Sequence, residues 1–433
     1  TFFEICYAFI SVADVFGPRN PYNSTLEESP MQPLASRMAV MTGEGALSVN
    51  ARARELERQG RSIIHLELGE PDFHPAPAVN DALKRALDDG KDRYCAVAGV
   101  PALREAIAHY LHDTRNLNLS PDQIVLAPGC KSALFMAMMA LIDPGDEVLY
   151  PDPGFPGYPS ITLGLGGVAV PFELSEHNRF QPDPEEITAK LTPRSKILIT
   201  NSPGNPTGTV YTDGIQRRLA ELAVEHDLVV LSDEIYARIV YGSQFLSMLS
   251  YPGMEDRTLI LDGFSKSFAM TGWRLGYTVA PARIVPALTM LAINSYTCVA
   301  EFSQYAAIEA LRDPDGATPR MVAEFAERRQ QFIRDLNRIP GFRCHAPEGA
   351  FYAWVNISDT GMTAEEICRI MLRRSRPCRD SRRSLRRGWP RLYPFLVRVI
   401  CCELARGSRE NHARIVCLAR EFGAGALARV KAL

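Results

Sequence analysis

The feature that most constrains the fold is a repeated alternation of short apolar segments with helical segments between residues 123 and 261. Short apolar segments of this kind are typical of parallel strands buried between two layers of helices. Helical periodicity extends to Leu141 after the first segment and covers Gln216–His226 after the second. The sequence therefore predicts an α/β fold, with a three-layer large domain and a mostly parallel sheet. The four apolar segments are Gln123–Leu126, Lys196–Thr200, Leu228–Leu231 and Thr258–Leu261.

The flanking regions predict a smaller α+β domain beside this large one. A charged helical segment, Val322–Leu336, precedes the strand-like Ala350–Val355. Near the other end, Ala46–Gln59 has helical periodicity, and Gly60 is a suitable C-terminal cap. We expect residues 71–311 to form the large domain, and the small domain to comprise the N-terminal segment 31–70 and the C-terminal part 312–433. Residues 1–30 are interpreted as an N-terminal extension.

Composition excludes several classes of protein. The net charge of −2 gives no global field that would attract nucleic acid or an anionic membrane. The sequence contains no apolar run of the about 18 to 20 residues that a membrane span needs, and no convincing signal peptide. Its ten cysteines lack the spaced pairs of a zinc module, so no metal site is expected. We expect a cytoplasmic protein that acts on small molecules.

Lys266 is the candidate catalytic residue. A lysine amine can hold a cofactor aldehyde as a Schiff base, and Arg274, eight positions later, can bind a phosphate bidentately. The intervening Thr271-Gly272 predicts a turn that folds the chain back toward Lys266. A lysine and an arginine at this spacing are usually solvated surface charges. The interpretation therefore depends on motifs elsewhere.

A second motif predicts a phosphate seat. Gly129, Cys130 and Lys131 form a glycine turn between a strand and a helix, which offers backbone N–H groups and a positive helix dipole to an anion. Turns of this type are common in α/β folds, so the signal is weak in isolation.

Asp233 follows the segment Leu228–Leu231, at the strand end where ligands bind. A carboxylate there can keep a pyridine nitrogen protonated, although a helix-capping role is an equally frequent reading.

Two further loops carry candidate residues. Asn201-Ser-Pro-Gly-Asn-Pro-Thr-Gly208 ends a strand with prolines and glycines that fix an irregular loop, from which Asn205 projects inward. Phe155, in Pro151-Asp-Pro-Gly-Phe-Pro-Gly-Tyr158, offers a flat apolar face for an aromatic cofactor. The alternative interpretations are that the prolines and glycines of Asn201–Gly208 only shape a loop, and that Phe155 only packs in the core.

Taken together, these motifs resemble the class I/II aminotransferases of fold-type I pyridoxal-phosphate enzymes, from about Ala46 to Asn356. The resemblance implies that Lys266 holds pyridoxal 5′-phosphate and then moves a proton at the substrate Cα. It implies that Asp233 pairs with the pyridine nitrogen. The remaining implied contacts are hydrogen bonds from Asn205 and Tyr236 to the phenolate oxygen, stacking by Phe155, and cofactor binding by Gly129, Cys130, Lys131, Ser265 and Arg274.

The resemblance also implies a homodimer. Tyr94 resembles the tyrosine that reaches the cofactor phosphate of the neighbouring subunit, and Gly69 resembles the glycine beside the substrate carboxylate. The expected reaction moves an amino group between an L-amino acid and a 2-oxo acid by a ping-pong mechanism. A carbon-sulfur lyase acting by β-elimination and a catalytically impaired cofactor-binding protein are the alternatives.

The C-terminal region departs from the family pattern. In place of the family's Pro-Gly-x-x-Phe-Gly loop, residues 373–388 carry a run of arginines, and residues 373–394 are atypical. We interpret part of this stretch as frame-shifted, because shifted codons can spell the missing loop. Arg398, in Phe395–Ile400, is the candidate clamp for the substrate α-carboxylate, and Arg406 is its rival.

Overall fold

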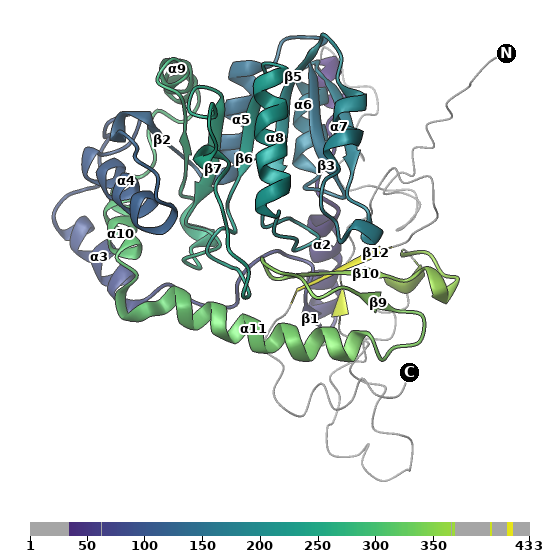
Figure 1. The fold of residues 1–433 in the computed structure, drawn as a ribbon. Coiled ribbons are helices and arrows are strands. Elements are labelled where there is room, and N and C mark those ends of the chain that lie inside the picture. Colours follow the sequence, from purple (N-terminus) through teal and green to yellow (C-terminus); the bar gives the residue numbers. More distant parts are fainter. Residues whose placement is uncertain (1–33, 62, 365, 369–398, 401–413, 419–433) are drawn as a thin grey trace.

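The computed structural model describes residues 34–61, 63–364, 366–368, 399–400 and 414–418. Its centre is a seven-stranded sheet with the strand order β2-β8-β7-β6-β5-β3-β4 (Figure 1). Strand β8 pairs antiparallel with β2 and β7, and the other neighbours pair parallel. The strands are β2 (Ile124–Ala127), β3 (Glu147–Asp152), β4 (Val168–Glu173), β5 (Ser195–Asn201), β6 (Val229–Asp233), β7 (Thr258–Gly263) and β8 (Gly276–Val279).

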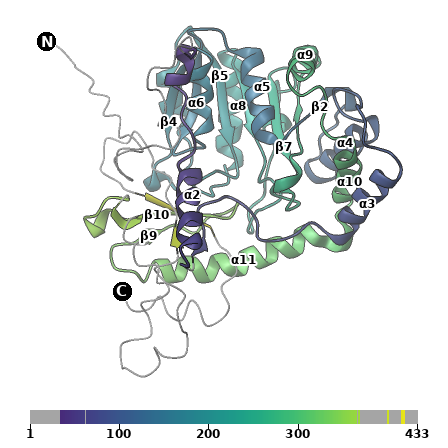
Figure 2. The same cartoon turned by 180° about the vertical axis from the view of Figure 1, so that it is seen from behind.

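Helices cover both faces of this sheet, as the two opposite views show (Figures 1 and 2). One face carries α5 (Cys130–Leu141), α6 (Gly157–Gly164) and α9 (Val285–Ser295), and the other carries α7 (Pro184–Lys190) and α8 (Asp213–Glu225). Strands β2, β7 and β8 are buried along their whole length. The predicted three-layer α/β fold with a mostly parallel sheet is confirmed.

Three helices pack together beside the β2 and β8 edge of the sheet: α3 (Pro77–Asp88), α4 (Pro101–Arg115) and α10 (Glu301–Leu311). Arg115, the last residue of α4, is bound to the sheet by buried charges. Its guanidinium donates to Glu234 at 2.5 Å and to Asp262, and all three side chains are at most 4% exposed. This triad ties the helical group to the ends of β6 and β7.

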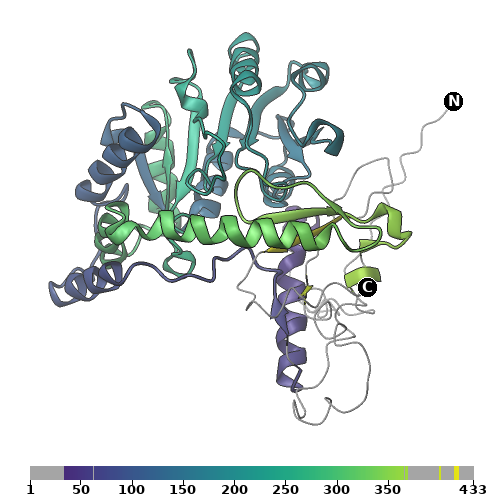
Figure 3. The same ribbon diagram turned by 60° about the horizontal axis from the view of Figure 1, so that its bottom comes forward.

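A long helix, α11 (Ala317–Leu336), runs from that helical group to a second, smaller sheet (Figure 3). The second sheet has the antiparallel order β12 (Arg414–Leu418), β10 (Tyr352–Asn356) and β9 (Arg343–Cys344). Helix α2 (Gly45–Arg58) lies near it, and β1 (Ile64–His65) pairs parallel with β11 (Val399–Ile400). Segments from the N-terminal and C-terminal parts of the chain thus lie next to each other. The predicted domain boundaries stay a prediction. In the described part of the chain, no helix has the length and apolarity to cross a membrane.

We expect Arg115→Met to lower the free energy of unfolding by about 3 to 5 kcal/mol, because it leaves two buried carboxylates without their counter-charge. Urea titration monitored by circular dichroism measures the change. Arg58→Met is the matched control, since Arg58 is 75% exposed in its pair with Glu55 and its loss costs at most about 1 kcal/mol. Equal losses in the two variants would contradict the structural role given to Arg115.

Candidate functional site

A cavity of about 270 Å³ lies where the carboxyl ends of β5, β6 and β7 meet the start of α5. Strands β3, β5, β6 and β7 are parallel, so the residues that follow them emerge at one edge of the sheet. Seventeen of the described residues line the cavity: Glu44, Ala46, Glu67, Gly69, Cys130, Lys131, Leu134, Phe155, Asn205, Asp233, Ile235, Tyr236, Ser265, Lys266, Thr271, Arg274 and Tyr352.

Asp233 is the last residue of β6 and its side chain is buried. The hydroxyl of Tyr158 donates to Oδ2 at 2.8 Å, and the backbone N–H of Ile235 donates to Oδ1 at 3.4 Å. Burial raises the pKa of Asp233 to about 6, and these two hydrogen bonds oppose the shift. Asp233 thus lines the cavity and forms no ion pair with a cationic side chain among the described residues.

Lys266 follows β7 and is partly buried. Its ammonium donates to the carbonyl of Gly69 and lies 5.8 Å from the centre of the Phe351 ring. Burial lowers the pKa of Lys266 to about 8, although Glu70 and Glu44 raise it in part. An amine with this pKa is available in its neutral, nucleophilic form near physiological pH.

The start of α5 forms an anion-binding end of the cavity. Gly129 is its N-cap, with a φ of 87° that favours glycine, and the N–H groups of Cys130 and Lys131 have no hydrogen-bond acceptor in the described residues. The Arg274 guanidinium lies against this turn, because a Cβ on Gly129 would come within 2.3 Å of its Nη2. Arg274 is held by the carbonyls of Thr271 at 2.9 Å and Pro128 at 3.2 Å.

Asn205 and Tyr236 face the same cavity from the loops after β5 and β6. The Oδ1 atom of Asn205 is buried and has no hydrogen-bond partner among the described residues. Its backbone N–H donates to Oδ1 of Asn201 at 2.7 Å, which fixes the loop. The hydroxyl of Tyr236 is hydrogen-bonded to that of Tyr352, and burial raises the pKa of Tyr236 well above its ordinary value.

Most of the residues that the sequence predicted to form the functional site line this cavity. Gly129 abuts it through Arg274, although it does not line it. Tyr94 lies apart from these residues on the surface, with 87% of its side chain exposed. Arg398 and Arg406 lie outside the described residues, so their predicted roles stay predictions. The nominated residues that line the cavity are Gly69, Cys130, Lys131, Phe155, Asn205, Asp233, Tyr236, Ser265, Lys266 and Arg274.

Sequence reasoning missed several residues of the site. Tyr158 ends the motif Pro151–Tyr158, three residues after Phe155. This spacing could have indicated that the Tyr158 ring contacts the ring of Phe155. Tyr352 lies in the predicted strand of the small domain, and only tertiary packing brings it to Tyr236. Glu44 and Glu67 also line the cavity, and no motif marks either of them.

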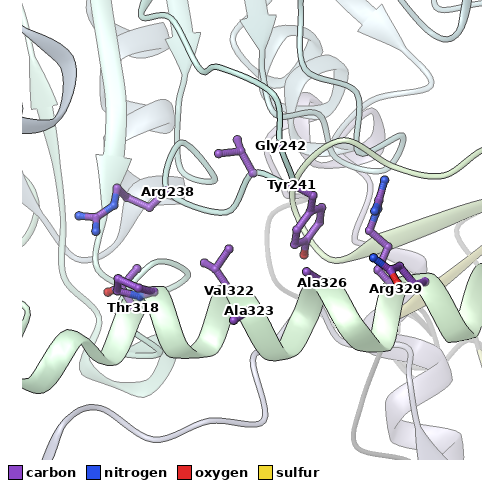
Figure 4. A pocket seen from close by; sticks show the side chains of 11 residues that line it. Arg238, Tyr241, Gly242, Thr318, Val322, Ala323, Ala326 and Arg329 are labelled. Carbon is purple, nitrogen blue, oxygen red and sulfur yellow. The ribbon is translucent and has the colours of Figure 1, made fainter.

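A second cavity of about 530 Å³ lies between α11 and the segment Arg238–Gly242 (Figure 4). Arg238 and Arg329 stand at its two ends, and Val322, Ala323 and Ala326 form the helix wall between them. The described residues that line it include no lysine and no carboxylate. This groove therefore lacks the chemistry of the first cavity, which we take as the candidate active site.

The fold and the site together define a class: an α/β enzyme whose active site combines a partly buried amine, a buried carboxylate and an anion-binding helix end. A family model described as aminotransferase class I and II matches residues 61–385. The chain belongs to this family, and it is an aminotransferase. The predicted family and the predicted enzyme class are confirmed. Aminotransferases of this family use pyridoxal phosphate, with amino acids and 2-oxo acids as substrates.

Similar proteins support the assignment over most of the chain. The aspartate/prephenate aminotransferase of Thermus thermophilus is 38% identical over 332 residues, which cover 76% of this chain and 85% of that protein. The aspartate aminotransferase of T. thermophilus, solved with maleate, superposes with a TM-score of 0.77 at 36% identity, covering 80% of this chain and 90% of that one. An aromatic aminotransferase from Pyrococcus horikoshii has a TM-score of 0.74 at 32% identity, covering 88% and 95%.

The raised pKa of Asp233 predicts a pH-dependent effect of Asp233→Asn on the cofactor-free protein. Between the ordinary value of 3.8 and about 6, the folded protein retains a proton that the unfolded chain releases. The contribution of Asp233 to the free energy of unfolding therefore falls as pH rises through this window and stays low above it. Asp233→Asn should raise the free energy of unfolding at pH 8 by about 2 to 3 kcal/mol, and by progressively less as the pH falls below about 6.

Urea titrations between pH 4 and pH 8 measure this difference. Asp359→Asn is the control, because Asp359 is 60% exposed and its replacement should give no such pH-dependent gain. A gain for Asp233→Asn that is the same at every pH would show that ionisation of the carboxylate is not its cause.

Proposed function

We propose that this chain catalyses transamination with pyridoxal 5′-phosphate held in the cavity at the carboxyl edge of the sheet. When bound, the cofactor supplies an electron-withdrawing ring that makes the proton on the substrate Cα removable. The observation that carries the proposal is the buried carboxylate of Asp233, which lines the cavity, forms no ion pair with a described residue and has its pKa raised to about 6 by burial. A protonated pyridine nitrogen supplies a cationic partner.

The residues around the cavity fit the other parts of this cofactor. We assign the phosphate to the anion-binding end formed by Gly129, Cys130, Lys131, Ser265 and Arg274. There the N–H groups of Cys130 and Lys131, which have no acceptor among the described residues, lie near the guanidinium of Arg274. The Oδ1 atom of Asn205, which has no hydrogen-bond partner among the described residues, can accept a hydrogen bond from a hydroxyl on the ring, and Tyr236 lines the same cavity. Phe155, which stands edge-on to Tyr158 at 5.4 Å, is assigned to ring stacking.

Lys266 is assigned the two roles that need an amine. It would hold the cofactor aldehyde in the resting enzyme, and it would move the proton between Cα of the substrate and C4′ of the cofactor. A pKa lowered to about 8 by burial suits both roles, because the group exchanges protons near physiological pH. The hydrogen bond from Nζ to the carbonyl of Gly69 supports placing the substrate carboxylate near Gly69. Arg398 remains the proposed clamp for that carboxylate.

Two substitutions test the lysine assignment. With pyridoxal phosphate added, the purified wild-type protein should gain a near-visible absorption band that Lys266→Ala abolishes, and Lys266→Ala should lower kcat by at least about 10²- to 10⁴-fold. Lys131→Ala is the matched control, since Lys131 lines the same cavity but its side chain is paired with Glu44. It should keep the band. The reverse pattern would overturn the assignment.

A screen of amino donors with 2-oxoglutarate as acceptor tests the reaction itself. We expect conversion of the donor to its 2-oxo acid only when the acceptor is present, because a ping-pong mechanism needs a second substrate to take the nitrogen. Pyruvate released from an amino acid without any acceptor would instead indicate β-elimination.

We also propose a homodimer in which Tyr94 reaches the cofactor phosphate of the neighbouring subunit. The support within this chain is that Tyr94, an aromatic residue, is 87% exposed. Mixing inactive Lys266→Ala subunits with Tyr94→Ala subunits should restore activity, because each mixed dimer then holds one site with both residues intact. A mixture no more active than its components would contradict a contribution from the neighbour.

A further inference from the structure

An ion pair between Glu44 and Lys131 forms part of the wall of the candidate active site. Glu44 is the residue just before α2, and Lys131 is the second residue of α5. The Lys131 ammonium donates to Oε1 of Glu44, and both residues line the cavity. Lys131 also lies 5.3 Å from the centre of the Phe155 ring. The side chain of Glu44 is only 26% exposed, so its carboxylate faces a partly desolvated space.

The charges that remain for the substrate are mostly negative. The side chains of Lys266, Asp233 and Arg274 are assigned to the cofactor, and Lys131 is assigned to it through its backbone N–H. This leaves the side chains of Glu44, Glu67 and Lys131 among the charged groups described as lining the cavity. These three carry two negative charges and one positive charge, and the positive one is already paired with Glu44.

Glu67 is the second of these carboxylates, and its partner His65 carries a charge only when protonated. The side chain of Glu67 is fully buried, and Oε1 is held by Nδ2 of Asn50 at 2.6 Å and by the ring of His65 at 2.6 Å. Its Oε2 atom has no hydrogen-bond partner among the described residues. Bringing a further carboxylate toward this wall is therefore unfavourable.

Apolar and aromatic side chains also line the cavity, and one of them, Phe155, contacts Lys131. The others are Ala46, Leu134, Ile235 and Tyr352. Every amino acid carries the same α-carboxylate, so discrimination between donors depends on the side chain. A neutral side chain can pack on this surface and leave the pair from Glu44 to Lys131 intact. A side chain with a carboxylate must displace Glu44 or lie next to it.

We propose that Glu44 is a specificity-determining residue that occupies the Lys131 ammonium and so selects amino donors with uncharged, apolar or aromatic side chains over those with a distal carboxylate. The inference rests on the proposed transamination at this site. Its physical basis is competition, because a single ammonium cannot give its full charge to two carboxylates at once. Glu44 acts on binding of the side chain and takes no part in the proton transfer.

Glu44→Gln removes the competing charge while keeping a side chain of the same shape. The ratio of kcat/KM for aspartate to kcat/KM for phenylalanine should rise at least about tenfold, since a hydrogen bond to a charged group contributes about 1.5 to 3 kcal/mol. The double variant Glu44→Gln with Lys131→Met should lose this gain. Glu55→Gln is the matched control, because it removes a carboxylate from the same helix outside the cavity and should leave the ratio as it is.

Ligand binding provides a second readout that does not depend on turnover. Isothermal titration of the cofactor-loaded protein should show maleate binding at least about tenfold more tightly to Glu44→Gln than to the wild type. Binding of 3-phenylpropionate, which has one carboxylate, should change by less. An unchanged aspartate to phenylalanine ratio together with unchanged maleate affinity overturns the role of Glu44, even if the wild type is an active aminotransferase. A wild type that transaminates no donor would instead defeat the proposed function.

Discussion

Burial of an acid and an amine at the same edge of a parallel sheet is the constraint on which the rest of this structure depends. Burial is the largest cause of both pKa shifts, upward to about 6 for Asp233 and downward to about 8 for Lys266. Each shift records a charge that the fold has moved out of water at a cost in stability. Binding of a group that interacts with the buried residue offsets this loss of stability. A cationic ring nitrogen can interact in this way with Asp233, and an aldehyde with Lys266.

The topology explains how residues far apart in the sequence reach this edge. Strands β5, β6 and β7 are adjacent and parallel, so the residues that follow them, among them Asn205 and Lys266, emerge side by side. Strand β8 returns antiparallel from the turn after Lys266, which brings Arg274 to the start of α5. The sequence could predict this much, because the buried strands are short and apolar and each candidate residue follows one of them. Helical patterns in the sequence also predicted α2 and α11, although α11 begins five residues earlier than the charged pattern indicated.

Other parts of the site were beyond the reach of sequence patterns. Strand β1 is only two residues long, and beyond it the chain bends so that Glu67 and Gly69 line the cavity. The hydrogen bond between Tyr236 and Tyr352 and the ion pair between Glu44 and Lys131 join residues separated by 116 and 87 positions. Contacts of this kind depend on how α2 and the second sheet pack against the first, which local periodicity does not encode. Substrate selection depends on these same long-range contacts, which is why the sequence alone left it open.

The central claim is that Lys266 is the residue that holds pyridoxal phosphate. Treating the cofactor-loaded protein with sodium borohydride fixes the cofactor covalently to the amine that carries it, and peptide mass spectrometry then locates the added pyridoxyl group. We predict that it is found on Lys266. A label on Lys131 or on any other lysine, or no label at all, would contradict the account.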